Sequence, residues 1–228
     1  MSHATPAEIR EAPSTRPLGL VLVDDHPAVR RGLGALLATE EGLRVLAAVA
    51  SAEEGLAAIE RLRPDVALLD FHLPKDDGLS LCLRTRALSH PPRVLMFSAF
   101  ADEALALQAT VAGAHGVLSK DAPFEELCAA VRAVAHGERR LAPVSPPVVA
   151  AHAAALDPAD RPILAMLRER VPEEEIAYTL GLDLGWLRTR RWAILGRLGE
   201  QSRRHGHPRR RAGSGGPSAA PPSGPEAA

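Results

Sequence analysis

Short apolar runs in the first half of the chain each end in a polar side chain. The groups at these ends are carboxylates, a hydroxyl and an ammonium, namely Asp24, Asp25, Asp70, Ser98 and Lys120. If the runs are parallel strands, these groups meet at the carboxyl edge of one sheet, where open α/β sheets bind ligands. Asp70 alone could equally be a turn or helix-capping residue. The other groups favour a shared site.

Three carboxylates in one pocket need a counterion. Two unit charges about 4 Å apart repel by roughly 4 kcal/mol at an effective dielectric near 20. A hard divalent cation with oxygen ligands, Mg²⁺ above all, would neutralise them. One carboxylate oxygen could then attack phosphorus, while the ammonium and the hydroxyl stabilise the transferred group. The product would be an aspartyl phosphate, and Lys120 and Ser98 could reorganise to meet its charge.

The elements that must position these groups alternate along the chain. Apolar runs predict strands over residues 18–23, 44–50, 66–69, 94–97 and 117–118. Helical spacing of apolar residues predicts a helix after each strand, with Ser51 and Glu54 as a capping box and Gly113 as a stop signal. Five strands alternating with five helices indicate an α/β fold with a doubly wound five-stranded parallel sheet.

The second half of the chain has a different pattern. Residues 139–155 are rich in proline and alanine and predict an interdomain linker. Residues 156–200 predict a small all-α domain, with a glycine-containing turn at Gly181 between two helices, which is the helix-turn-helix layout. Residues 1–16 and the basic tail 201–228 have compositions typical of disorder. Residues 17–138 then form the α/β domain.

The composition is that of an ordinary soluble protein, with 228 residues, 46% hydrophobic and 24% charged, and a formal net charge of −1. This balance excludes bulk charge as the driving force for binding nucleic acid or membrane. No apolar stretch approaches the roughly 18 residues that span a bilayer, and the N-terminus lacks a signal-peptide core, so we expect a cytoplasmic protein without membrane partners. Cys82 and Cys128 lack metal-ligand spacing and predict buried thiols.

Four segments carry a specific resemblance. The stretches DDHPAVRRGL, PDVALLDFHLPKDDGL, VLMFSAF and GVLSKDAP resemble, in order and spacing, the receiver domain of two-component response regulators across residues 18–138. Residues 156–199 resemble the LuxR-type helix-turn-helix, including its EIA segment, LGL turn and terminal RLG. The whole chain is similar to response regulators of the NarL/FixJ class, which implies a flavodoxin-like receiver.

The resemblance implies a role for each group of the pocket. Asp70 would be the phosphoacceptor and Asp25 a direct Mg²⁺ ligand, with Asp24 acting through water and the backbone carbonyl of His72 completing the protein ligands. Ser98 would be the switch hydroxyl and Lys120 the phosphate-binding ammonium. One departure is Val117, where the family commonly has an aromatic residue. Phe100 could replace that aromatic residue or lie in the core. His26 and His72 could tune dephosphorylation or simply face solvent.

The output half implies DNA contacts but departs from the family pattern. The side of the last predicted helix opposite its apolar face carries Gly185, Arg188, Thr189 and Trp192. Arg188 and Thr189 are candidates for base or phosphate contacts, and Arg190 and Arg197 for backbone affinity. Trp186 replaces a small hydroxyl residue of the family, Arg191 replaces an apolar core residue, and Trp192 is bulky for a major groove.

These features predict a bacterial transcription regulator that is not an enzyme. A histidine kinase would donate a phosphoryl group to Asp70 with Mg²⁺, and the phosphorylated protein would bind a roughly palindromic promoter site as a homodimer. One alternative is a signalling protein whose altered helical module binds other proteins rather than DNA. Another is a phosphatase of the haloacid dehalogenase type, but that class needs an aspartate two residues after the nucleophile, where this chain has His72.

Overall fold

The strands and helices of the first half lie close to their predicted bounds. A computed structural model describes residues 16–204. Its strands are β1 (Leu18–Val23), β2 (Leu43–Val49), β3 (Val66–Asp70), β4 (Arg93–Ser98) and β5 (Gly116–Ser119). The helices between and after them are α1 (Pro27–Thr39), α2 (Ala52–Leu62), α3 (Gly78–Thr85), α4 (Glu103–Ala112) and α5 (Phe124–Ala135).

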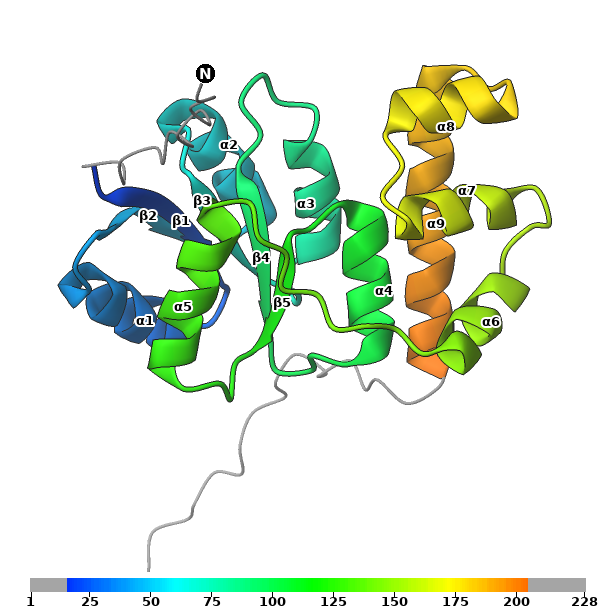
Figure 1. Cartoon of the computed structure of the whole chain (residues 1–228). Coiled ribbons are helices and arrows are strands. Elements are labelled where there is room, and N and C mark those ends of the chain that lie inside the picture. Colours follow the sequence, from blue (N-terminus) through cyan, green and yellow to red (C-terminus); the bar gives the residue numbers. More distant parts are fainter. Residues whose placement is uncertain (1–15, 205–228) are drawn as a thin grey trace, which may run out of the picture.

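The five strands form one parallel sheet in the order β2-β1-β3-β4-β5. This is the doubly wound order in which the strand order reverses beside β1 and β3. Alternate residues of each strand face opposite sides, so Leu20 and Leu68 pack with Leu37 of α1 and Val131 of α5, whereas Leu69 packs on the other face. Helices α2, α3 and α4 cover that other face (Figure 1).

Local signals in the sequence begin and end these helices. Ser51 accepts a hydrogen bond from the backbone N–H of Glu54 at the start of α2. Asp77 and Asp102 cap α3 and α4 in the same way through Ser80 N–H and Leu105 N–H. Each cap satisfies one of the backbone donors that a helix N-terminus leaves unpaired. These caps therefore fix the residues at which α2, α3 and α4 begin after the loops that follow the strands.

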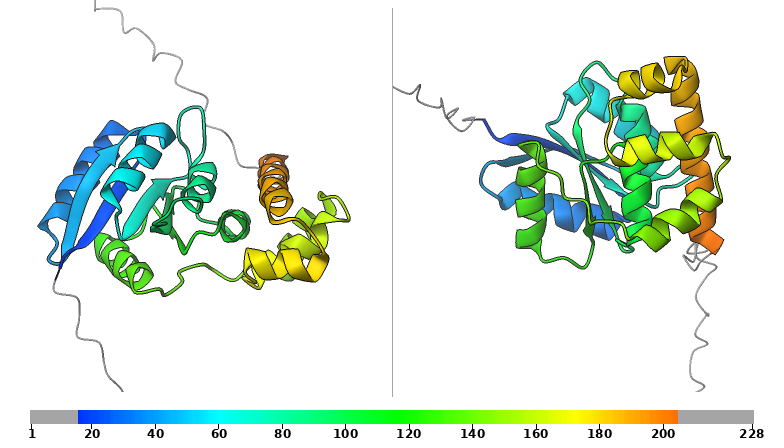
Figure 2. Two further views of the ribbon diagram at one scale, coloured as in Figure 1. Left: turned by 90° about the horizontal axis from the view of Figure 1, so that it is seen from above. Right: turned by 45° about the vertical axis from the view of Figure 1, so that its right-hand side comes forward.

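The second half contains four helices that lie beside α4. They are α6 (Pro146–Ala154), α7 (Asp160–Arg168), α8 (Glu173–Leu180) and α9 (Leu184–Arg204). Helix α9 runs along α4, and α6 and α7 also contact α4 (Figures 1 and 2). The apolar residues of this output module, including Ile163, Ile194 and Leu198, belong to the same buried cluster as the receiver face under α3 and α4. The two halves are therefore docked.

The structure corrects several expected boundaries. The linker predicted over residues 139–155 contains helix α6. Helix α9 continues to Arg204, beyond the predicted end of the domain at residue 200. Arg16, expected to be disordered, forms an ion pair with Asp65 at 2.6 Å. The disorder predicted for residues 1–15 and 205–228 lies outside the described residues.

Within residues 16–204, no helix is both long enough and apolar enough to cross a membrane.

Candidate functional site

Asp70 is the last residue of β3 and is buried, with 3% of its surface exposed. In the sheet register Val23 pairs with Leu69 and Phe97 pairs with Asp70. The residues after Val23 and Phe97 are Asp24 and Ser98, so both lie at the same sheet edge as Asp70. The strand ends thus bring together groups that are far apart in the sequence, as predicted.

Lys120 joins two of the carboxylates. Its Nζ lies 2.7 Å from Asp24 Oδ2 and 2.8 Å from Asp70 Oδ2. Its backbone N–H donates to the carbonyl of Ser98, which fixes the loop after β5 against β4. Burial acts to lower the pKa of the ammonium, but its hydrogen bonds to Asp24 and Asp70 outweigh burial and raise that pKa. Lys120 therefore stays charged.

Burial has the opposite consequence at Asp70. It raises the pKa of this carboxyl above its usual range, although the contact with Lys120 acts to lower it and the charge of Asp24 adds to the rise. The carboxylate form is thus costly in this pocket without a further cation. A divalent ion would remove that cost.

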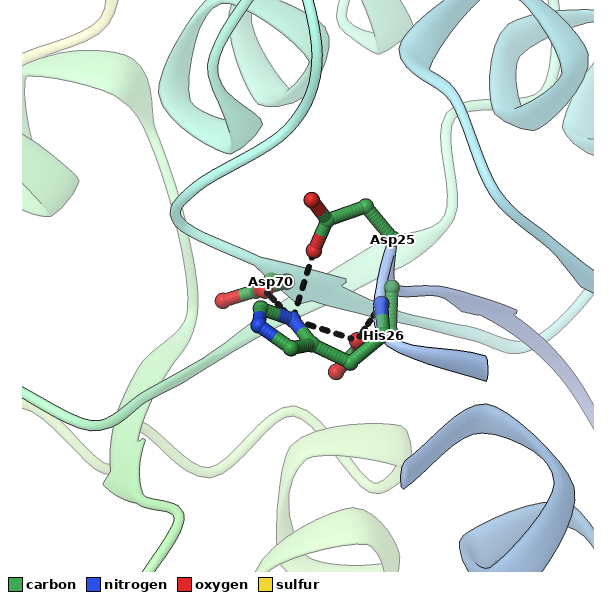
Figure 3. A group of neighbouring side chains, drawn as sticks. Asp25, His26 and Asp70 are labelled. Carbon is green, nitrogen blue, oxygen red and sulfur yellow. Dashed lines mark hydrogen bonds and ion pairs between the residues drawn. The ribbon is translucent and has the colours of Figure 1, made fainter. Parts of the chain in front are cut away.

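His26 places its imidazole over the acidic cluster (Figure 3). Its Nδ1 lies 2.6 Å from Asp25 Oδ1, 3.5 Å from Asp24 Oδ1 and 3.9 Å from Asp70 Oδ2. Its backbone N–H donates to Asp24 Oδ1 at 2.8 Å and orients that carboxylate. The side chain is half-exposed, so the interpretation of His26 as a turn residue facing solvent describes only part of its position.

The cluster has the donor set of a cation site. One ligand atom from each of Asp24, Asp25, His26 and Asp70 lies within 4.8 Å of the others. Asp25 Oδ1 is buried, and apart from the contact with His26 Nδ1 it accepts no hydrogen bond from the described residues. A buried carboxylate oxygen with so little hydrogen bonding is a suitable ligand for a hard cation such as Mg²⁺. The carbonyl of His72 as a further ligand stays a prediction.

The remaining predicted groups surround this pocket. Ser98 is fully buried, and its Oγ accepts a hydrogen bond from Phe100 N–H at 3.1 Å. Val117, which departs from the aromatic residue common in the family, is partly buried against the core. The core position considered for Phe100 is wrong, because this side chain is 40% exposed and meets the ring of His72 edge-on.

Sequence reasoning missed the role of Gly78. This residue begins α3, and a Cβ at this position would overlap the backbone carbonyl oxygen of Asp70 at the end of β3. In the segment Asp76-Asp77-Gly78, nothing local distinguishes a turn glycine from one that a neighbouring strand requires. Gly78 lets α3 approach Asp70 closely.

The arginines predicted to contact DNA are engaged within the chain. Arg188 is 61% exposed, and its Nε donates to Glu173 at 3.1 Å. Arg190 pairs with Asp157 and Asp160, and Arg197 pairs with Asp157 at 2.8 Å. Thr189 and Trp192 are both exposed, so of the predicted contact residues only they, with Arg188, form an accessible face of α9.

Arg191 instead joins the output module to the receiver. It is buried, with 3% exposed, and its Nε donates to the carbonyl of Val111 in the last turn of α4. Its Nη1 pairs with Glu173, which also lies 3.8 Å from Arg86 of the receiver. A cation is favourable at a helix C-terminus because the carbonyls there are unpaired. Arg191 can therefore occupy a buried position where the family has an apolar residue, because the carbonyl of Val111 and the carboxylate of Glu173 bind its guanidinium.

A buried polar network makes a second connection between the two halves. Gln108 of α4 donates to Ser202 Oγ of α9 at 3.0 Å. The same hydroxyl donates to Leu198 O and lies 3.2 Å from His152 Nε2 of α6. Sequence reasoning did not identify this network, because its members are up to 94 residues apart.

Known proteins share both the sequence and the fold of this chain. The model of the response regulator receiver domain family matches residues 20–132. The nitrate/nitrite response regulator protein NarL of Escherichia coli is 32% identical over 177 residues, which cover 73% of this chain and 82% of NarL. The transcriptional regulatory protein UhpA of Salmonella typhimurium is 34% identical over 184 residues, which cover 79% of this chain and 91% of UhpA.

Solved structures agree with these matches. A two-component response regulator of the LuxR family from Aurantimonas has a TM-score of 0.53 and 33% identity, covering 56% of this chain and 91% of that one. The signal receiver domain of the putative response regulator NarL from Mycobacterium tuberculosis has a TM-score of 0.52 and 34% identity, covering 54% of this chain and 99% of that domain.

Proposed function

Because this chain belongs to the two-component response regulators of the NarL and UhpA type, we propose that it regulates transcription by accepting a phosphoryl group on Asp70 and binding DNA through α9. The single observation that carries the proposal is the position of Asp70 at the end of β3. The carboxylate is buried there between an ammonium and two further carboxylates.

The transfer itself is a displacement at phosphorus. An oxygen of Asp70 forms the new bond, while the phosphorus–nitrogen bond of a kinase phosphohistidine breaks and its electron pair returns to the imidazole, which takes up a proton. Mg²⁺ would be held by Asp25 and Asp70, with Asp24 acting through water, and would neutralise charge on the transferred group. Lys120 lies beside Asp70 and would bind the phosphoryl oxygens, and Ser98 would supply a hydroxyl from the neighbouring strand.

Docking of α9 on α4 explains why a signal is needed. An α-helix with its side chains is about 10–12 Å across, and the major groove of DNA is about 12 Å wide. A groove filled by α9 has no room for α4 beside it. We infer that α4, packed along α9, obstructs entry of this helix into the groove, although Arg188, Thr189 and Trp192 are exposed. Phosphorylation would favour the undocked state, which would bind a palindromic site as a homodimer.

The relatives disfavour the other functions considered. Both NarL and UhpA are named as regulators rather than enzymes, and UhpA as a transcriptional one, which argues against a phosphatase and against a module that binds only proteins. His72 occupies the position where a dehalogenase-type phosphatase needs its second aspartate.

The first experiment measures the intact mass of the protein after incubation with Mg²⁺ and acetyl phosphate. Wild type should gain one phosphoryl group, and Asp70→Asn should gain none. Asp65→Asn is the matched control, because Asp65 precedes β3 at the opposite end of the strand from Asp70 and pairs with Arg16. An adduct that persists in Asp70→Asn would refute the assignment of the phosphoacceptor.

The second experiment measures DNA binding. Genomic fragments retained by the phosphorylated protein provide the duplex, and Arg188→Ala should weaken binding to it by about 10-fold or more, as expected for a lost phosphate or base contact. Unchanged affinity would remove Arg188 from the recognition face. Retention that survives only at low salt would favour the protein-binding alternative.

A further inference from the structure

Four arginines surround residues 113–115, where the receiver, the linker and the output module join. They are Arg86 after α3, Arg93 at the start of β4, Arg139 in the linker and Arg170 between α7 and α8, and we call them the seam cluster. Arg93 begins the strand that Ser98 ends, so this cluster lies at the opposite edge of the sheet from Asp70. The connection from α7 to α8 passes the C-terminal end of α4 at this edge (Figure 1).

Three of the four arginines of the seam cluster lack a counterion among residues 16–204. Arg93, Arg139 and Arg170 have no carboxylate within ion-pair distance among residues 16–204, and Arg86 shares Glu173 with two other arginines. Burial and the charges of Arg170, Arg93 and Arg86 lower the pKa of Arg139. Burial and the same cationic surroundings lower the pKa of His115 to about 4. Like charges from both halves thus face one another across the seam.

Two hydrogen-bond donors point at each other in the same place. The backbone N–H of Val94 donates to Nδ1 of His115 at 3.1 Å, so the proton of the neutral ring is on Nε2. The guanidinium Nη1 of Arg93 lies 3.0 Å from that Nε2. Neither group finds an acceptor in the described part of the chain. One external oxygen could accept from both.

An open pocket adjoins these cations. It has a volume of about 310 Å³ and lies between Leu107 and Thr110 of α4, linker residues 141–144, Arg168 and Arg170. Its linker and α4 walls are largely apolar, while its two arginines are not paired with any described carboxylate. The volume is at the lower end of the range of small-molecule sites, and domain interfaces are a common location for them.

We propose that the seam binds a nucleoside diphosphate, with the phosphates on the seam cluster and the base in the adjoining pocket. Guanidinium groups bind phosphate oxygens in pairs of parallel hydrogen bonds, and several of them favour a ligand with adjacent phosphates. The pocket walls suit an organic group rather than a bare ion. Because the ligand contacts both halves, it stabilises the docked arrangement by mass action. The proposal is independent of chemistry at Asp70.

Isothermal titration of the full chain tests the site, with GDP, pyrophosphate and inorganic phosphate as probes. GDP should bind once per chain, pyrophosphate more weakly and phosphate more weakly again. Arg139→Ala and Arg170→Ala should each weaken GDP binding by about 10-fold or more, as expected for a lost charge-assisted contact. Arg31→Ala is the matched control, because Arg31 is an exposed arginine of α1.

Thermal unfolding without a probe separates ligand binding from a structural role. If the seam arginines repel one another, Arg139→Ala and Arg170→Ala leave the melting temperature unchanged or raise it, whereas structural arginines would lower it. No saturable heat with GDP at millimolar concentration would overturn the proposal, as would equal GDP binding in the control and seam variants. Duplex DNA that displaces GDP and binds in a manner dependent on Arg139 and Arg170 would make the seam a nucleic-acid surface instead.

Discussion

Replacing Arg191 by methionine should weaken the docking of α9 on the receiver. The ion pair between Arg191 and Glu173 lies within the output module and survives undocking, since both residues belong to α8 and α9. The bond from Arg191 to Val111 O crosses between the halves and is lost on undocking. A hydrogen bond from a charged donor contributes about 1.5–3 kcal/mol. Taking about 2 kcal/mol, Arg191→Met should shift the docking equilibrium about 30-fold toward the undocked state.

The assay compares DNA affinity with and without phosphorylation, because α9 itself carries the substitution. Fluorescence anisotropy with the retained genomic duplex gives both dissociation constants, and their ratio cancels any direct loss of DNA contact. The apparent affinity of the unphosphorylated protein scales with its undocked fraction. The ratio should therefore fall by up to about 30-fold in Arg191→Met.

Two further variants make the test specific. Gln108→Leu acts from the receiver side, where it removes a bond to Ser202, and a neutral hydrogen bond of about 1 kcal/mol predicts a change in the ratio of about five-fold. Arg188→Met is the control on α9, because its bond to Glu173 stays within the output module. It should weaken both affinities equally. An unchanged ratio in both Arg191→Met and Gln108→Leu would refute the idea that these contacts hold the docked state.

Three other substitutions have defined outcomes. Lys120→Met leaves two buried carboxylates without their ammonium, which should lower the free energy of unfolding by about 3 kcal/mol in metal-free thermal unfolding. Mg²⁺ should then stabilise this variant more than it stabilises wild type. Equal effects of Mg²⁺ on the two proteins would argue against a shared cation site. Gly78→Ala should lower the free energy of unfolding in urea by about 2 kcal/mol, because the new Cβ displaces the carbonyl of Asp70. The same displacement should slow formation of the phosphoryl adduct. An unchanged rate of adduct formation would contradict this prediction. The pKa of His115 is about 4 in the folded protein and 6.5 in the unfolded chain, so protonation of His115 favours unfolding as the pH falls from 6.5 toward 4. At pH 5 this lowers the free energy of unfolding by about 2 kcal/mol. In urea unfolding at pH 7 and pH 5, His115→Asn should therefore lose about 2 kcal/mol less stability than wild type between the two pH values.

The sequence predicted the receiver well because its signals are local. Buried strands are continuous apolar runs, and helix ends carry caps such as Ser51 and Asp102 or a stop such as Gly113. Once the strands are parallel, their ends must share an edge, so Asp24, Asp70 and Lys120 could be placed together from their positions in the chain.

The second half shows where such signals fail. Helix α6 has the sequence PPVVAAHAA, which lacks the alternation of polar and apolar faces that marks an amphipathic helix. The pairs that hold Arg190 and Arg197 join residues that lie some tens of positions apart. The sequence marks Arg191 as unusual, but its partner is the backbone carbonyl of Val111 in the receiver. Because every residue has a backbone carbonyl, the sequence does not indicate which one an arginine will bind.

The close approach at Gly78 has a mechanical consequence. Helix α3 has eight residues and is about 12 Å long, and most of its side chains are buried, so we expect it to move as a rigid unit. One end approaches the carbonyl of Asp70 closely, and the other is followed by Arg86 of the seam cluster, which lies beside Glu173. A helix of eight residues bends little along its length. A displacement of the Asp70 backbone would therefore be passed to α3, whose other end lies beside Glu173 of the output module.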